Sequence, residues 1–174
     1  MLGLTLSVVA GGVTGSRAWA QESPDPPALV LEAMAEAEAA IQGQEPQLAE
    51  SRYRTALLEG WLLKGALAAA QSHWGLAQTA YEAAMSSGVE TRRARLFLAD
   101  VHIRNGEPSE AILLLRKIIG KDLRDAQARR LLAQALAADG QLVESVLELE
   151  SLQMMYPEDP ENLFLLGTAY LRQG

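Results

Sequence analysis

Three glycines, Gly106, Gly140 and Gly174, recur at a spacing of 34 residues. The apolar residues around them recur in the same phase, so residues 58–174 divide into three full copies and one partial copy without insertion or deletion. Within each copy the apolar residues are three or four positions apart, which is the period of an amphipathic helix. The glycines fall where a first helix must end and the chain must reverse, a position that favours positive φ. The repeat therefore predicts a series of helical hairpins.

The second helix of each hairpin has its own pattern. A small residue follows the turn position by five residues, and a bulky apolar residue follows four residues later, one helical turn along the same face. The small residues are Ala77, Ala111 and Ser145, and the bulky ones are Tyr81, Leu115 and Leu149. The small side chains are expected to let the two helices approach closely. Pro157 is expected to end a second helix, and Pro160 to open the next first helix.

This pattern resembles the tetratricopeptide repeat, which has a 34-residue period and the consensus W-x2-L-G-x2-Y…A-x3-F…P. The residues that match the consensus or its usual substitutions are Trp61, Gly65, Ala77, Tyr81, Ala84, Leu98, Gly106, Ala111, Leu132, Pro157, Leu166, Gly167 and Tyr170. The departures are Lys64 for Leu, His102 and Leu136 for Tyr, and Leu123 for Pro. The resemblance implies an all-α, right-handed superhelical solenoid of antiparallel helix hairpins. A related helix-pair solenoid, or an ordinary helical bundle with accidental periodicity, is the alternative.

The chain divides into segments along these lines. Residues 1–20 are predicted to be a signal peptide, residues 21–27 a Pro-rich linker, and residues 28–57 a degenerate first hairpin. Full repeats are predicted at 58–91, 92–125 and 126–159, and the first helix of a partial repeat at 160–174.

The first 20 residues have the composition of a secretory leader. An apolar run from Leu2 to Ala10 is followed by Ala18-Trp19-Ala20, a small-x-small cleavage site, although no Lys or Arg follows Met1 closely. Cleavage after Ala20 would export the protein to the periplasm or the medium. No run long enough to span a bilayer follows, so no integral membrane span is expected in the mature chain. The chain has no cysteine, which excludes disulfides and a lipid-modified cysteine anchor.

The degenerate first copy is six residues short of the period. Ala28–Gln42 is predicted to be a helix, followed by a turn at residues 43–46. Because no room remains for a loop before the next copy, one long helix is predicted from near Gln47 to Ala70. Gly60 lies inside that helix at a cost of about 1 kcal/mol relative to Ala, and a turn at Glu59-Gly60 is the alternative.

The charge distribution suggests a partner. The net charge is −7, yet residues 92–130 hold ten bases and five acids, with acidic segments on both sides. The resemblance implies a concave groove lined by the first helix of each hairpin. Its residues would be Arg93, Leu96, Asp100, Ile103, Arg104, Gln127, Arg130, Gln134, Ala138, Phe164, Thr168 and Leu171. Such a groove suits an acidic, partly apolar peptide. The alternative is that these charges are solvated or pair with the Glu-rich neighbours. The Lys/Asn pattern with which some family members bind a C-terminal carboxylate is absent.

No pattern indicates catalysis. His73 and His102 are the two imidazoles, without Cys or metal-binding spacing, so neither a metal nor a cofactor is expected. No Gly-rich phosphate loop is present, and the acidic net charge with little aromatic interleaving argues against nucleic acid.

The sequence thus predicts a non-enzymatic protein–protein interaction scaffold, acting in envelope or secretion complex assembly. The alternative is a repeat module truncated from a larger secreted enzyme or sensor. Self-association through the C-terminal helix is a further hypothesis, because Leu163, Leu166 and Tyr170 lack a covering second helix.

Overall fold

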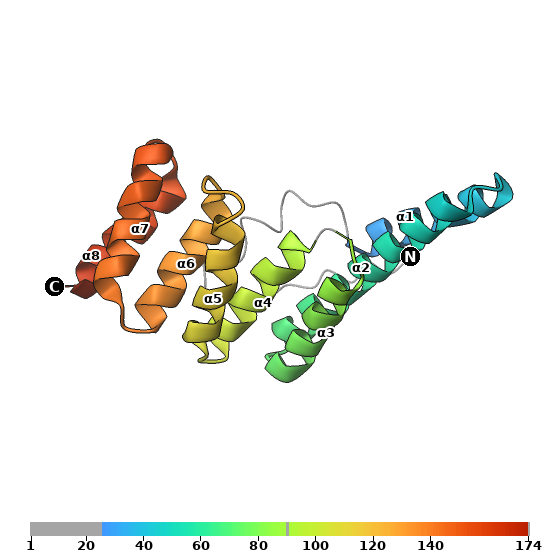
Figure 1. Ribbon diagram of the computed structural model, residues 1–174. Coiled ribbons are helices and arrows are strands. Elements are labelled where there is room, and N and C mark those ends of the chain that lie inside the picture. Colours follow the sequence, from blue (N-terminus) through green and yellow to red (C-terminus); the bar gives the residue numbers. More distant parts are fainter. Residues whose placement is uncertain (1–25, 90, 174) are drawn as a thin grey trace, which may run out of the picture.

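The computed structural model describes residues 26–89 and 91–173; the expected signal peptide and most of the expected linker lie outside them. The described residues form eight helices and no strand (Figure 1). In chain order these are α1 (Pro26–Gln42), α2 (Pro46–Ala70), α3 (Trp74–Ser86), α4 (Arg92–Arg104), α5 (Pro108–Ile119), α6 (Ala126–Ala138), α7 (Leu142–Met155) and α8 (Pro160–Gln173).

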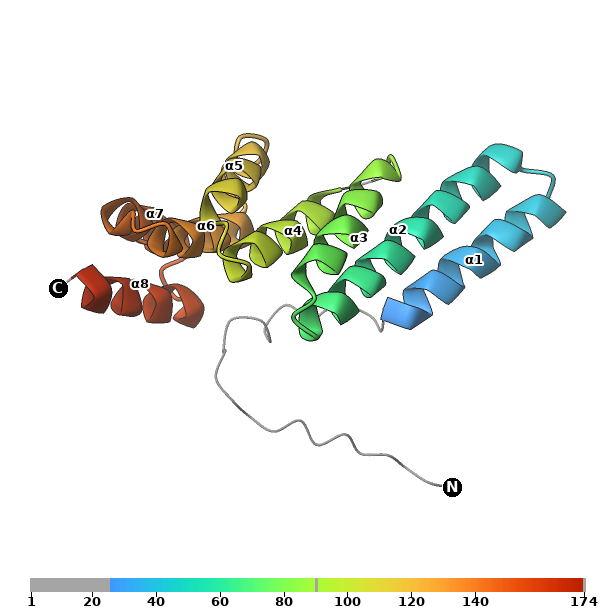
Figure 2. The ribbon, with the colours of Figure 1, turned by 90° about the horizontal axis from the view of Figure 1, so that it is seen from below.

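The helices stack side by side in the order of the chain. Each packs chiefly on the helices before and after it, and α1 and α8 lie at opposite ends of the array (Figures 1 and 2). A closed bundle would bring the first and last helices together. The structure is therefore an all-α solenoid of helix pairs, as the sequence predicts.

The turns repeat in detail. Gly106 and Gly140 adopt φ of 80° and 84°, and Ser72, which occupies the equivalent position one copy earlier, adopts φ of 59°. In each turn the residue after this position donates its backbone N–H to the carbonyl five residues earlier, at 2.8–2.9 Å. This is the Schellman arrangement that closes a helix with a left-handed residue. The prediction of positive φ is confirmed for both described glycines, and Gly174 lies outside the described residues.

Prolines mark several helix starts. Helices α2, α5 and α8 begin at Pro46, Pro108 and Pro160, where the missing N–H is not needed and the fixed φ suits the first turn. Pro157 follows the end of α7. Helix α1 begins at Pro26, two residues before the expected start at Ala28, so the linker does not extend to residue 27. A proline in the first turn of a helix accounts for this difference.

Helix α2 is the long helix that the sequence predicts, and Gly60 lies within it. Its first half packs on α1 and its second half on α3 (Figure 2). The α1–α2 contact is built from alanines, whose small side chains allow close approach; those buried are Ala33, Ala37, Ala40, Ala49 and Ala56.

Inside each repeat, a small residue of the first helix meets a large residue of the second. Gly65 faces the ring of Tyr81: a Cβ built on Gly65 would lie 2.4 Å from Cε1 of that ring. The equivalent residues in the next two repeats are Ala with Leu, namely Ala99 with Leu115 and Ala133 with Leu149, and all four are buried. Burial also raises the pKa of the Tyr81 phenol. The repeat register predicted from the sequence therefore describes the packing.

Candidate functional site

The second half of α2 and helices α4, α6 and α8 form one side of the solenoid, called the inner face below. Helix α2 contacts α4, and α4 contacts α6, whereas no comparable contact joins α3 to α5 or α5 to α7 among the described helices. Helix α8 is joined to α6 by side-chain bonds from Arg130 to Asn162 and Glu161. Helices lie closer together on the concave side of a curved array, so the inner face is the concave one. Every residue of the predicted groove lies on α4, α6 or α8.

One predicted groove residue is not on the surface. Leu96 is only 2% exposed and packs in the core with Ala99, Leu132 and Ala135, between α4 and α6. The direct contact of α4 with α6 covers this position. The expectation that the Leu96 side chain faces a partner is therefore wrong, and Leu96 is a core residue.

Arg93 is engaged within the protein. Its Nη1 donates to Oε1 of Glu59 on α2 at 2.6 Å, and the Glu59 side chain is only 9% exposed. The second carboxylate oxygen, Oε2, is buried without a hydrogen-bond partner among the described residues. Glu59 and Arg93 occupy equivalent positions of consecutive repeats. Their ion pair therefore joins α2 to α4 across the repeat boundary.

Arg130 joins α6 to the last repeat in a similar way. Its Nε donates to Oδ1 of Asn162 at 2.8 Å, its Nη2 pairs with Asp159, and its Nη1 lies 3.1 Å from the Glu161 carboxylate. Asn162 is fully buried, and its Nδ2 has no partner in the described part of the chain. It occupies the position of Ala128 in the previous repeat. Arg130 thus pairs with two acids and orients a buried amide.

The third arginine of the predicted groove, Arg104, pairs with Asp100 one helical turn away, at 2.8 Å. All three arginines that were expected to attract an acidic peptide are therefore paired with acids of the same chain. This agrees with the alternative reading from the sequence, in which these charges pair with acidic neighbours. The roles of Glu59, Asp159 and Asn162 were not predicted from the sequence. Glu59 and Arg93 carry opposite charges at equivalent positions of consecutive repeats, and this pattern could have predicted their ion pair.

The uncharged residues of the inner face divide into two groups. On α6, Gln127 and Gln134 are partly buried, and Gln127 accepts from Arg92 at 3.4 Å. On α8, Thr168 is partly buried and its hydroxyl donates to the carbonyl of Leu165. The exposed members on α8 are apolar: Phe164 is 60% exposed and Leu171 is 85% exposed. The α8 end of the inner face is therefore an uncovered apolar surface.

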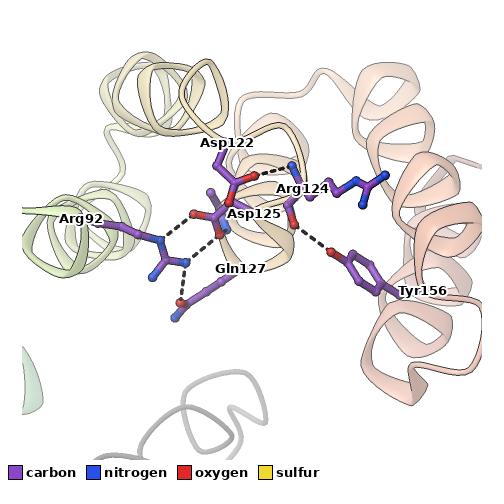
Figure 3. A network of polar contacts seen from close by, with 7 residues as sticks. Arg92, Asp122, Arg124, Asp125, Gln127 and Tyr156 are labelled. Atoms are coloured by element: carbon purple, nitrogen blue, oxygen red, sulfur yellow. Dashed lines mark hydrogen bonds and ion pairs between the residues drawn. The ribbon is translucent and has the colours of Figure 1, made fainter.

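A polar network fixes the loop between α5 and α6 (Figure 3). Arg92 on α4 donates through Nε and Nη2 to both carboxylate oxygens of Asp125 at 2.7 Å, and Asp125 accepts the N–H of Ala128 as the N-cap of α6. From the other side, the hydroxyl of Tyr156 donates to the carbonyl of Arg124 at 2.9 Å. Burial alone would raise the pKa of Asp125, but the bonds from Arg92 and the helix N-terminus outweigh it and lower that pKa.

The described residues hold no cluster of side chains arranged as a catalytic or metal-binding site. His102 is buried and its Nδ1 lies 2.8 Å from the Glu107 carboxylate, while His73 is exposed at the start of α3. Among residues 26–89 and 91–173, no cluster of three metal-ligating side chains is found, and none of the helices is both long and apolar enough to span a bilayer. An open apolar hollow of about 600 Å³ lies on the first hairpin rather than the inner face, lined by Ile41, Pro46, Ala49, Glu50, Tyr53, Arg54 and Leu57.

Comparison with known proteins agrees with this architecture. Residues 62–122 match a family model described as Tetratricopeptide repeat. Among solved structures, YrrB, described as a TPR protein with an unusual peptide-binding site, is similar with a TM-score of 0.56 and 19% identity over 83% of this chain and 77% of YrrB. A structure named MamA RS-1 ArsTM double mutant gives a TM-score of 0.59 and 17% identity, covering 86% of each chain. No curated protein matches the sequence.

Proposed function

Because residues 62–122 match the tetratricopeptide repeat family and the fold is a solenoid of helix pairs, we propose that the chain is a tetratricopeptide repeat protein, a non-enzymatic scaffold that binds a segment of another protein on its inner face. Phe164 and Leu171 carry the proposal, because the repeat pattern puts both at groove positions of α8 and their side chains are 60% and 85% exposed. Contiguous exposed apolar side chains on a soluble surface are typical of interaction sites. The peptide-binding site named for YrrB is a further support.

The pairing of the arginines on the inner face limits which kind of segment can bind there. Because Arg93, Arg104 and Arg130 are already paired, an acidic segment would have to compete with Glu59, Asp100 and Asp159 for them. An apolar side chain inserted beside Phe164 gains burial of about 25 cal/mol per Å² without breaking those pairs. We therefore assign to the inner face a segment anchored by an aromatic or aliphatic residue.

Export and the cellular setting belong to the same proposal. The apolar run and small-x-small site in residues 1–20 support cleavage near Ala20 and a periplasmic or secreted mature protein. In that setting a scaffold without catalytic groups would serve envelope or secretion complex assembly. N-terminal sequencing of the protein recovered from the cell envelope tests this, and a mature chain that retains Leu2–Ala10 would contradict it.

The binding proposal is tested by co-isolation from the source cells with quantitative mass spectrometry. A variant with Phe164→Ser and Leu171→Ser is compared with the wild type and with Leu76→Ser, whose side chain is also 60% exposed but lies on α3, outside the inner face. We expect the inner-face variant to lose the major co-isolated protein and the α3 variant to retain it. Retention of every partner by both variants would refute the inner-face assignment.

Two hypotheses from the sequence remain predictions. Self-association through α8 predicts that the apparent mass from light scattering rises with protein concentration, and that Tyr170→Ser reduces the rise. The alternative role, as a repeat module of a larger secreted enzyme or sensor, would use the same inner face for contact with the rest of that protein.

A further inference from the structure

We propose that the end of α5 and the α5–α6 loop form a second docking surface, which binds an acidic, partly apolar segment of a partner protein. The surface is called the basic edge and consists of Arg116, Lys117, Lys121, Leu123 and Arg124. It rests on the proposed function, since it gives the same scaffold another contact with a partner. The loop caps the adjacent ends of α5 and α6 (Figure 1).

The four cations of the basic edge are exposed and their charges are not neutralised within the described chain. The ion pairs among the described residues use other bases, on α2, α4 and α6. One acid, Asp122, lies among the four, and its carboxylate accepts the backbone N–H of Arg124 at 2.9 Å. The basic edge is therefore a site of positive charge on a protein whose net charge is −7.

The fold does not require these cations. Arg116 occupies the position of Glu82 in the previous repeat and of Glu150 in the next, and Arg124 occupies that of Glu158. Basic residues near a helix C-terminus gain about 0.3–1 kcal/mol from the helix dipole, yet α3 and α7 place acids at the position of Arg116. Lys121 and Arg124 lie beyond the end of α5 and have no such reason. The positive charge of this repeat is therefore available to an external partner.

The loop that carries Leu123 and Arg124 is fixed in place (Figure 3). The hydroxyl of Tyr156 donates to the Arg124 carbonyl, and Nε of Arg129 donates to the Leu123 carbonyl at 2.8 Å. On the opposite side, Asp125 is paired with Arg92. Despite these bonds the Leu123 side chain is 67% exposed. A loop held in one conformation loses less entropy on binding, so it presents an apolar side chain among cations at low cost.

The chemistry of the edge matches a polypeptide better than a membrane. Acidic carboxylates complement the four cations, and an apolar side chain covers Leu123. In the flanking repeats the equivalent positions hold the acids Glu82, Glu150 and Glu158, which would repel an anionic bilayer that extended over them. A narrow polypeptide segment can contact the basic edge alone.

The test selects peptides from a random library displayed on phage against the full chain, and measures selected peptides by fluorescence anisotropy. Lys117→Glu with Arg124→Glu is compared with Arg52→Glu with Arg54→Glu, which changes the charge equally on α2, remote from the edge. Far-UV circular dichroism confirms that each variant is folded. We expect peptides that combine Asp or Glu with Leu or Phe, and binding about tenfold weaker in the edge variant, which corresponds to about 1.4 kcal/mol. The α2 variant should bind within about twofold of the wild type, since its charges lie on the first hairpin, away from α5 and α6 (Figure 1), and salt screens charges over long distances.

Each outcome separates the two proposals. Selected peptides without acidic enrichment, or equal binding by the edge variant, would overturn the basic edge. Peptides whose binding depends on Phe164 and Leu171 but not on Lys117 and Arg124 would support the inner-face scaffold and refute the basic edge as a docking surface. Failure to select any peptide would count against both. Binding of phosphatidylglycerol vesicles that is lost in the edge variant, without peptide binding there, would assign the edge to a lipid surface and overturn the protein partner.

Discussion

Replacing Gly65 by Ala would place a methyl group in steric clash with the ring of Tyr81. The built Cβ lies 2.4, 2.7 and 2.8 Å from three ring carbons, and Tyr81 is buried against Phe97 with ring centroids 5.5 Å apart. The ring cannot move without disturbing the next repeat. Overpacking of this kind costs about 1–3 kcal/mol, while Ala in place of Gly inside a helix gains about 1 kcal/mol. We expect Gly65→Ala to destabilise the protein by up to about 2 kcal/mol.

Gly60→Ala is the matched control. Gly60 lies in the same helix, α2, and a Cβ there would meet nothing within 4 Å. The substitution should therefore stabilise the protein by up to about 1 kcal/mol, through helix propensity alone. The two variants should differ by about 1–3 kcal/mol in unfolding free energy, measured by urea denaturation followed by far-UV circular dichroism, which isolates the clash with Tyr81.

The following repeats supply a rescue. They pair Ala99 with Leu115 and Ala133 with Leu149 at the positions of Gly65 and Tyr81. Adding Tyr81→Leu to Gly65→Ala should therefore cost less than the two single changes summed, by about 1–3 kcal/mol, as expected for residues in contact. Equal stability of the Gly65→Ala and Gly60→Ala variants, or strict additivity of the double variant, would show that the repeat register is misassigned.

Four further changes test other parts of the structure, each by the urea midpoint. Ser72→Gly should stabilise the protein by up to about 1 kcal/mol, because Ser72 adopts φ of 59° where glycine has no Cβ penalty; no gain would show that the serine is not strained. Gly140→Val should cost about 1–3 kcal/mol, since Gly140 has φ of 84° and open space around it, and the cost is therefore backbone strain alone. Arg93→Ala should lower the free energy of unfolding by about 1–3 kcal/mol, less than the 3–5 kcal/mol expected for a fully buried pair, because the Arg93 side chain is 39% exposed. Combining it with Glu59→Gln should recover part of the loss. An Arg93→Ala variant as stable as the wild type would show that the ion pair does not stabilise the fold, and would make Arg93 a candidate for partner binding again. Folding lowers the pKa of Asp125 from 3.8, so the unfolded chain binds more protons in acid, and the stability that this carboxylate contributes above about pH 4 is lost as the pH falls through the folded pKa. Asp125→Asn keeps an N-cap acceptor and should lose less stability in acid than the wild type. Identical pH profiles of stability would contradict the role of this carboxylate.

The repetition made most of the fold predictable from the sequence. A 34-residue period predicts where the helices of residues 58–174 lie. The six residues missing before Trp61 leave no room for a loop, which predicts the continuous α2. The turn conformation at Gly106 and Gly140 follows from glycine's freedom at positive φ. The same position holds Ser72 in the earlier copy, where the same hairpin turn requires a conformation that serine does not favour.

The candidate site was less predictable, because it depends on contacts between helices. The groove positions follow from the family pattern, but whether Arg93 and Arg130 are free depends on which acid the adjacent repeat brings beside them. Leu96 illustrates the same limit: its helical phase points to the inner face, yet the approach of α6 buries it. The basic edge differs, since two of its four cations, Arg116 and Arg124, stand at positions where other repeats carry acids, and this contrast is visible in the sequence.

The central claim is that the inner face of the stacked repeats holds a second polypeptide. Photo-cross-linking in the source cells tests it most directly, with a benzophenone amino acid placed singly at Phe164, at Leu171 and at the outward position Leu76. The account predicts a discrete adduct with another protein from Phe164 and Leu171, and none from Leu76. Absence of adducts from both inner positions, in protein that is folded and produced at the normal level, would contradict it.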